Sequence, residues 1–331
     1  MRLPYFVSLL AASASSAAFA RDAGGRLDVA PLAGSCPAGV NTACAPDGSA
    51  VCCPIFMSQS NWGCCKLAGG VCCPVSPGVQ GCCPASTTCV QTSLYGATCV
   101  PAGGGPNVSA TQVCTPGARY APSAALPSVI TIGDSVSEGY EPVLAANLSA
   151  VAQVQHSPWS VGGGADDVGN GVNCLDEFVR TAMWQPANWS VVSFNFGLHD
   201  LDNSTAAEAF YAAALANFTA RLQAKQPAAK LAYISTTPFM PQQYYGNNAV
   251  TDLNAIAQRI MAAAGIPYLD LYAHVTARCG AKYSACDICD DEPSAWPAGA
   301  PAGAHCGYHY TPEGYAYLVE FLGPAFRALI A

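Results

Sequence analysis

Ser135 lies where an apolar, β-branched run of the chain ends and a helix is expected to begin. The run, residues 129–132, reads as a buried strand, and Gly133 lets the backbone turn sharply after it. A serine in this turn exposes its hydroxyl, and a helix N-terminus favours the negative charge that develops during acyl transfer. A serine that merely caps a helix would show the same tripeptide. The pattern therefore predicts a nucleophile, provided that the chain also supplies the groups that would activate this serine.

An acyl-transferring serine needs a base within hydrogen-bond reach, donors for the oxyanion and, often, a group that orients the base. His309 is the best candidate for the base. It lies on the loop before the last predicted helix, which begins at Pro312 with Thr311 as its N-cap. A side chain on such a loop can project over the end of a sheet. The alternative is a surface histidine near a helix start.

The segments that must position these residues alternate between strand-like and helix-like patterns. Strands are predicted over 128–133, 151–156, 191–196, 231–236 and 268–271. Helices are predicted over 141–150, 174–183, 205–226 and 250–264, with a last one from residue 312. The strands are short and mostly apolar on both faces, as in a parallel sheet covered by helices. We therefore expect an α/β fold, a three-layer α/β/α sandwich that binds ligands at the carboxyl ends of its strands.

Three motifs follow these elements in order: Gly133-Asp-Ser135 after the first strand, Phe196-Gly-Leu-His-Asp200 after the third, and His309-Tyr-Thr-Pro before the last helix. Their order resembles the SGNH (GDSL-type) hydrolase family, and the resemblance spans residues 128–331. It implies a flavodoxin-like sandwich that hydrolyses esters without a cofactor. By that resemblance, Ser135 is the nucleophile and His309 is the general base that takes its proton.

The same resemblance implies an oxyanion hole formed by the N–H of Ser135, a glycine N–H and a side chain of the middle motif. We place the glycine at Gly164, in a triple-glycine loop after the second strand, with Gly163 as the alternative. The family carries asparagine in the middle motif, whereas this chain has His199. Imidazole can donate through one ring nitrogen, and Asp200 beside it could fix the tautomer. We interpret His199 as a substituted oxyanion donor; a structural role is the alternative.

The family places an acidic residue two or three positions before the base histidine, and here those positions hold Gly307 and Cys306. Loss of the orienting acid lowers the rate without abolishing catalysis. Either the site works as a Ser–His dyad, or a backbone carbonyl or a displaced carboxylate orients the base. The candidates for such a carboxylate are Asp287, Asp290 and Asp291.

Cysteine spacing divides the chain into two parts. Twelve of the 18 cysteines lie between residues 36 and 99, as four adjacent pairs flanked by two single cysteines on each side. This segment has few large apolar residues and must be stapled by disulfides. Its layout resembles a granulin (epithelin) module at residues 34–100, a family of β-hairpin stacks held by a ladder of disulfides. A linker rich in Gly, Pro and Ser is expected over 101–127.

The other six cysteines belong to the C-terminal domain and predict three disulfides. Cys306 is expected to pair with Cys279, Cys286 or Cys289, which would pin the loop of His309. The pair Cys286 and Cys289 also has the spacing of a redox dithiol, although no metal or other cofactor is predicted. A calcium site is the alternative for the nearby acidic cluster of Asp287, Asp290, Asp291 and Glu292.

Residues 1–20 have the pattern of a secretory signal peptide, with one positive charge, a short apolar core and an Ala-x-Ala site. The apolar part is too short to span a bilayer. The formal net charge is −8, with no basic stripe for nucleic acid. The chain is therefore expected to be secreted through the secretory pathway. It could carry glycans at its Asn-x-Ser/Thr sequons, which are Asn107, Asn147, Asn188, Asn203 and Asn217.

The function expected from the sequence is that of a secreted serine esterase working through an acyl-enzyme. A small-molecule or carbohydrate ester with a short acyl group, such as acetyl, is the preferred substrate because the domain shows no long apolar lid segment. The alternative is a catalytically weak or inactive hydrolase scaffold. Such a protein would act through its granulin-like module on a protein or glycan partner.

Overall fold

The structure is a computed structural model. It describes residues 20–21, 27–28, 51–54, 62–76, 79–93, 96–103, 108–109, 111–114, 117–159, 163–181 and 186–331. The predicted signal peptide lies outside these residues except for Ala20, and so does the sequon at Asn107.

The C-terminal domain is built on one sheet of five parallel strands in the order β12, β11, β13, β14, β15. Their bounds are β11 Ser128–Ile132, β12 Gln153–Ser157, β13 Val191–Phe194, β14 Lys230–Ile234 and β15 Tyr268–Leu269. β12 pairs with one edge of β11, and the next strand along the chain, β13, pairs with the other edge. The topological switch point of the sheet therefore lies between β11 and β13. Ligands of such sheets bind outside the carboxyl ends of the strands at this point. The order is that of a flavodoxin-like sandwich, which confirms the predicted fold class.

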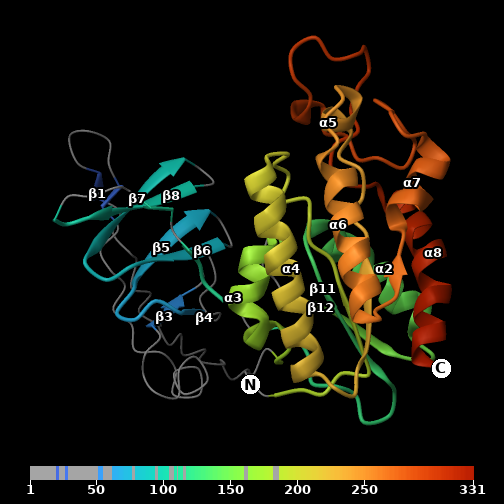
Figure 1. Cartoon of the computed structure of the whole chain (residues 1–331), viewed down its shortest axis with the longest axis horizontal. Helices are drawn as coiled ribbons and strands as arrows, with labels where there is room; N and C mark the ends of the chain where they lie inside the picture. Colours follow the sequence, from blue (N-terminus) through green and yellow to red (C-terminus); the bar gives the residue numbers. More distant parts are fainter. Residues whose placement is uncertain are drawn as a thin grey trace, which may run out of the picture.

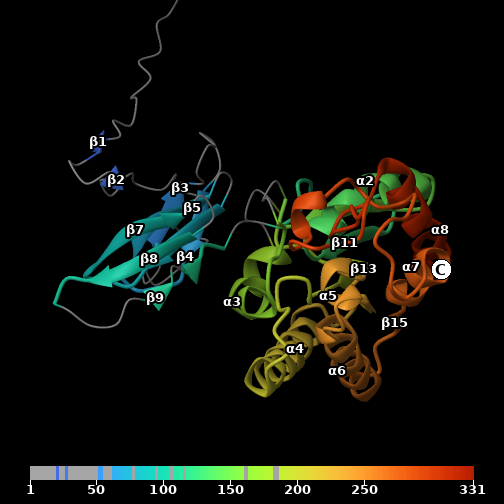
Figure 2. The same ribbon diagram turned by 90° about the horizontal axis from the view of Figure 1, so that it is seen from above.

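Helices cover both faces of the sheet, as Figure 2 shows from above. One face packs against α2, α7 and α8 around core residues such as Val129 and Leu144, and the other packs against α3, α4 and α6 around Ile130 and Phe218. Val129 and Ile130 are neighbours whose side chains point to opposite faces, so β11 is buried on both sides. The helix bounds are α2 Ser135–Leu148, α3 Val168–Phe178, α4 Thr205–Lys225, α5 Met240–Tyr244, α6 Ala249–Ala264, α7 Leu271–Cys279 and α8 Pro312–Ile330, with a 3₁₀ turn, η1, at Pro293–Ala295.

Two helices begin earlier than their apolar patterns indicate. The predicted start at Glu141 is wrong because α2 begins at Ser135, where the Asp134 side chain accepts a hydrogen bond from Val136 N at 3.0 Å. α3 begins at Val168 under the cap of Asp167, six residues before the predicted start. Both first turns carry polar or glycine residues, which interrupt the apolar periodicity without preventing a capped helix. The short helices α5 and α7 were not predicted.

The N-terminal module is a set of antiparallel hairpins, β3/β4, β5/β6 and β7/β8, seen beside α3 in Figure 1. Disulfides join successive hairpins: Cys53–Cys72, Cys65–Cys82, Cys73–Cys89 and Cys83–Cys99. The sulfurs replace the apolar core that so short a segment cannot build, as the cysteine spacing predicts. The strand bounds are β1 Ala20–Arg21, β2 Leu27–Asp28, β3 Val51–Pro54, β4 Trp62–Cys65, β5 Val71–Ser76, β6 Val79–Cys83, β7 Thr87–Ser93, β8 Gly96–Pro101, β9 Val108–Ser109 and β10 Thr111–Gln112.

The module is tied to the C-terminal domain at α3. Cys114, in the predicted linker, pairs with β4 through its backbone at Cys64 and forms a disulfide with Cys174 of α3. Lys66 of the module also forms an ion pair with Glu177 at 2.5 Å, where the Glu177 side chain is only 1% exposed. Cys114 of the linker and Lys66 of the module therefore both connect the two parts through α3.

Candidate active site

The first residue of α2, Ser135, lies at the carboxyl end of β11, an inner strand of the sheet. Its position is set by the turn at Asp134, whose carboxyl group caps the helix. Burial raises the pKa of this carboxyl group above its ordinary value. The Ser137 hydroxyl below the turn donates to Asp134 O at 2.6 Å and lies 2.6 Å from His156 Nε2. These contacts support the turn from inside and leave the Ser135 hydroxyl free to face the edge of the sheet.

His309 meets Ser135 across a sequence separation of 174 residues. Its Nε2 lies 2.8 Å from Ser135 Oγ, within hydrogen-bond range. The loop that carries it ends at Thr311, whose hydroxyl accepts the N–H of Gly314 and caps α8. The structure thus brings together the predicted nucleophile and base in a geometry that permits proton transfer.

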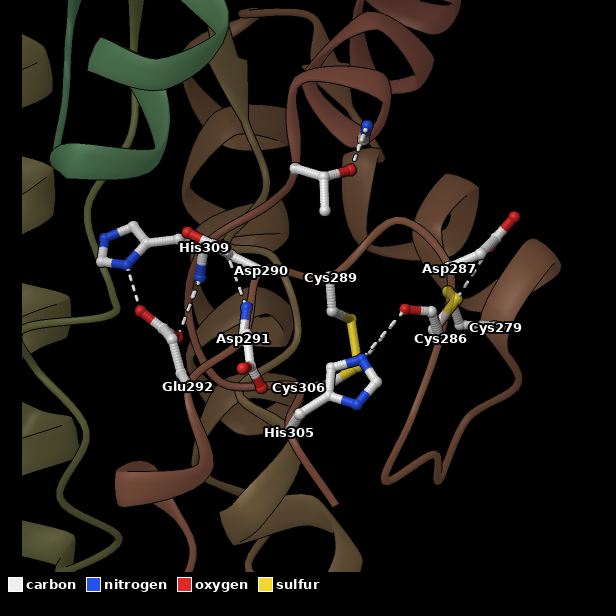
Figure 3. Close-up of a disulfide and its surroundings, with 12 residues drawn as sticks. Cys279, Cys286, Asp287, Cys289, Asp290, Asp291, Glu292, His305, Cys306 and His309 are labelled. Carbon is white, nitrogen blue, oxygen red and sulfur yellow. Dashed lines mark hydrogen bonds and ion pairs between the residues drawn. A yellow bond between two sulfur atoms is a disulfide. The ribbon is translucent and has the colours of Figure 1, made fainter. Parts of the chain in front are cut away.

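The other ring nitrogen of His309 faces the carboxylate of Glu292, as Figure 3 shows. Nδ1 bonds to Oε1 of that carboxylate, while Oε2 accepts the backbone N–H groups of Tyr308, at 2.5 Å, and His309, at 3.3 Å. The Glu292 side chain is 21% exposed. An acceptor at Nδ1 favours the tautomer with its proton there, which leaves Nε2 able to accept the serine proton.

Gly307 explains why this carboxylate can reach the histidine. It occupies a position where an acidic residue was expected, and a Cβ there would lie 2.1 Å from Glu292 Oε2 and 2.9 Å from its Cβ. Such distances are far below van der Waals contact. The absence of a side chain at Gly307 therefore makes room for a carboxylate that arrives from another segment.

The three predicted carboxylates do not contact the His309 ring. Asp287 forms an ion pair with Arg278, and Asp290 accepts the N–H of Asp291 at 2.8 Å. Figure 3 shows the Asp287 side chain beyond the disulfides, away from His309. Glu292 occupies the place that Asp287, Asp290 or Asp291 was expected to fill. Glu292 directly follows these three candidates in the chain, and no local pattern distinguishes which acid turns inward.

Backbone contacts and a disulfide hold the two segments of this pair side by side. Asp290 N donates to His309 O at 3.1 Å, and Glu292 N donates to His305 O at 2.9 Å. The Cys289–Cys306 disulfide closes the same loop, which confirms that Cys306 pairs within the expected group and beside His309. Cys279 pairs with Cys286, so Cys286 and Cys289 belong to different disulfides and do not form a redox dithiol.

Gly164 lies directly against the serine turn. Its φ is +64°, and a Cβ there would lie 2.2 Å from Gly133 O, so this position requires glycine on both counts. The next residue, Ala165, donates its N–H to the same oxygen at 2.8 Å. Among the described residues, the N–H groups of Ser135 and Gly164 have no acceptor. Both are therefore available to an oxyanion at the serine.

His199 lies against the loop that carries Gly164. Its Nδ1 is 2.7 Å from an oxygen of Asp166, and its side chain is 36% exposed. Burial opposes the charged ring, but the hydrogen bond and charge of Asp166, with the charges of Asp134 and Asp200, raise the pKa of His199 to about 9. Asp200 itself accepts the N–H of Val168 at 3.2 Å and does not bond to the ring. Asp166, which was not among the predicted site residues, therefore holds the ring instead of Asp200.

Within the described ranges, the only close group of potential metal ligands is Cys73, Cys83 and Cys89, in the module. Their sulfurs are already joined in disulfides with one another or with Cys99. A thiolate site is therefore not available there. None of the helices in the described part of the chain has the length and apolar character that a membrane crossing requires.

Comparison with known proteins bears on the C-terminal domain. The model of the GDSL-like Lipase/Acylhydrolase family matches residues 131–317. Similar solved structures include a lipase/acylhydrolase from Enterococcus faecalis, with 18% identity, a TM-score of 0.44, and coverage of 61% of this chain and 96% of that one. Another is the acetyl xylan esterase AlAXEase, with 13% identity, a TM-score of 0.43, and coverage of 60% and 98%. No curated protein matches the chain.

Proposed function

Because this chain belongs to the GDSL-like lipase/acylhydrolase family, whose members act on ester bonds, we propose that it is a secreted serine esterase with a Ser135–His309–Glu292 triad. The observation that carries the proposal is the unbroken chain of contacts from the Ser135 hydroxyl through both ring nitrogens of His309 to the Glu292 carboxylate. In the tautomer that carries its proton on Nδ1, these contacts allow the serine proton to pass to Nε2. The carboxylate comes from an unexpected residue, and this arrangement speaks against an inactive scaffold.

In the proposed reaction, Ser135 Oγ attacks the ester carbonyl carbon while its proton passes to His309 Nε2. The carbonyl oxygen becomes negative and accepts hydrogen bonds from the N–H groups of Ser135 and Gly164 and from His199. The bond to the alcohol then breaks, and His309 gives its proton to the leaving oxygen. Water attacks the acyl-enzyme, loses a proton to His309, and the carboxylic acid leaves as Ser135 regains its hydrogen. Glu292 stabilises the imidazolium in both halves.

A short acyl ester on a carbohydrate is the proposed substrate, supported by an aromatic surface near the triad. Tyr245 is 52% exposed and Tyr244 38%, and both rings pack against the buried Trp296. Trp296 in turn donates to Cys306 O at 2.9 Å, three residues before His309. Exposed, rigidly backed aromatic rings offer flat apolar faces to the C–H faces of sugar rings. We therefore place the carbohydrate over α5, beside the loop of His309.

The proposal is tested by hydrolysis of p-nitrophenyl acetate and by acetate release from an acetylated polysaccharide, with wild type, Ser135→Ala and Ser149→Ala. Ser149 is an exposed serine at the end of the same helix and serves as the matched control, with all three proteins made in a host that does not glycosylate, because Ser149→Ala also removes the Asn147 sequon. Ser135→Ala should lose turnover and labelling by a fluorophosphonate, while Ser149→Ala keeps both. Equal rates for wild type and Ser135→Ala would refute the proposed esterase.

Secretion and substrate choice have separate tests. Disulfides in the described parts of both domains suit an oxidising compartment. Expression of the full chain in a eukaryotic host should therefore yield protein in the medium with residues 1–20 removed, as N-terminal sequencing would show. Tyr245→Ala should raise KM for the polysaccharide and leave p-nitrophenyl acetate hydrolysis unchanged. An equal effect on both substrates would contradict the carbohydrate surface.

A further inference from the structure

His199 is held by a residue from the loop that also carries Gly164. Asp166 lies two positions after this glycine, and its oxygen is 2.7 Å from His199 Nδ1. The backbone of Asp166 has a φ of +61°, a left-handed conformation that aspartate tolerates better than most residues. The other ring nitrogen, Nε2, has no hydrogen-bond partner among the described residues. The two nitrogens are thus differentiated, one fixed to the loop and one free to serve the site.

We propose that Asp166 is a positioning residue that keeps His199 doubly protonated and turns its Nε2–H toward the oxyanion. A cation held by a carboxylate would then replace the neutral amide that the family pattern has at this position. This inference rests on the proposed esterase function. It assigns Asp166 a role in the reaction without any contact with the substrate.

The charges around His199 support a cationic ring. Burial penalises the charged form, yet the carboxylates of Asp166, Asp134 and Asp200 together bring its pKa to about 9. Burial raises the pKa of Asp200 to about 7, so this carboxyl is only partly charged near neutral pH, and burial also raises the pKa of Asp134. Asp166 is the only one of the three that bonds to the ring. Its carboxylate should therefore provide most of the stabilisation of the imidazolium.

A charged donor has a defined consequence for the reaction. Hydrogen bonds from ionised donors are roughly twice as strong as those between neutral groups. The charge also acts on the oxyanion itself, which is negative only in the tetrahedral state, so the benefit falls on kcat more than on KM. The same charge is lost above the pKa of His199. Activity should therefore decline on the alkaline side as the ring loses its proton.

Loop contacts keep Asp166 in place. Its N–H donates to Gly163 O at 3.3 Å, and the Asn170 side chain donates to Ala165 O at 2.9 Å from within α3. A Cβ on Gly163 would lie 3.8 Å from His199 Cε1, so the ring lies alongside this loop. One short segment thus positions both the Gly164 N–H and the imidazole donor. A shift of this segment would disturb both donors together.

The test compares wild type, Asp166→Asn, His199→Asn and the double variant as purified full chains. Asparagine at position 166 can still accept the Nδ1 hydrogen bond but carries no charge. For Asp166→Asn we expect kcat at pH 8 to fall ~10–100-fold with KM within about twofold, and the alkaline limb of the pH profile to move toward neutrality. The His199 pKa, followed by ¹⁵N NMR of the imidazole, should fall as well.

His199→Asn restores the amide of the family pattern and should remain active without an alkaline limb from this group. In that background, Asp166→Asn should cause no further loss. Asp202→Ser, which removes an exposed carboxylate from the His199 loop, is the control and should leave the profile unchanged. An unaltered pH profile in Asp166→Asn, or an equal loss in the His199→Asn background, overturns the inference. Failure of Ser135→Ala to lose activity would instead refute the esterase itself.

Discussion

Replacement of Glu292 by glutamine provides a demanding test of the triad. Oε2 of Glu292 accepts the N–H groups of Tyr308 and His309, and Oε1 faces Nδ1 of the ring. In Glu292→Gln the two backbone donors require the amide oxygen, so the NH₂ group must face Nδ1. It would then donate to Nδ1 and place the ring proton on Nε2. His309 in that tautomer cannot accept the proton of Ser135.

The magnitude follows from this change of tautomer. Replacing the triad carboxylate of a serine hydrolase by its amide lowers kcat ~10⁴-fold, which corresponds to ~5.4 kcal/mol. Glu292→Ala removes the carboxylate but forces neither tautomer, because no NH₂ group faces Nδ1. We therefore expect the alanine variant to be slow but faster than the glutamine variant. This order is specific to a carboxylate fixed by two backbone donors.

The assay is kcat for p-nitrophenyl acetate at pH 8, with the melting temperature of each variant as a folding check. Asp287→Asn is the matched control because Asp287 is paired with Arg278 and makes no contact with His309. A glutamine variant within ~10-fold of wild type, a difference of only ~1.4 kcal/mol, would refute the assignment of Glu292. A comparable loss in Asp287→Asn would refute it equally and return the role to the residues expected first.

Three further outcomes follow from the same region. Gly307→Ala would place a Cβ 2.1 Å from Glu292 Oε2 and should reduce kcat ~10–100-fold. The variant should remain folded by circular dichroism, and full activity would contradict the close packing at Gly307. Replacing Cys289 and Cys306 together by serine opens a loop with a sequence separation of 17 and should lower the free energy of unfolding by ~3 kcal/mol. The measurement is the melting temperature without reductant, and an unchanged melting temperature would disprove the stabilising role of this disulfide. Burial raises the pKa of Glu141 to about 7. The contribution of this carboxyl group to folding stability is therefore fully present below pH 4.5, its ordinary pKa, and is lost as the pH rises through 7. Glu141→Gln should therefore raise the melting temperature at pH 8 but not at pH 4.5, and an equal rise at both would exclude a charge effect.

Local patterns predicted the sheet, and together with the family resemblance they selected Ser135 and His309. A buried strand, a sharp turn and a capped helix each depend on a few consecutive residues, so the type of residue at each position carries the information. The alternating segments determined the α/β class, and the adjacent cysteines determined that the first module is stapled. Helix starts were less predictable, because the caps Asp134 and Asp167 act where the apolar periodicity is absent.

The completion of the site was decided only in three dimensions. Glu292 reaches His309 from 17 residues upstream because backbone pairing and the Cys289–Cys306 disulfide align two loops, and because Gly307 leaves space for its carboxylate. Asp166 reaches His199 in the same way, across a gap of 33 positions in the chain. A sequence shows that acids are present near both histidines. Which acid turns toward the histidine depends on long-range packing, and local residue preferences do not predict that packing.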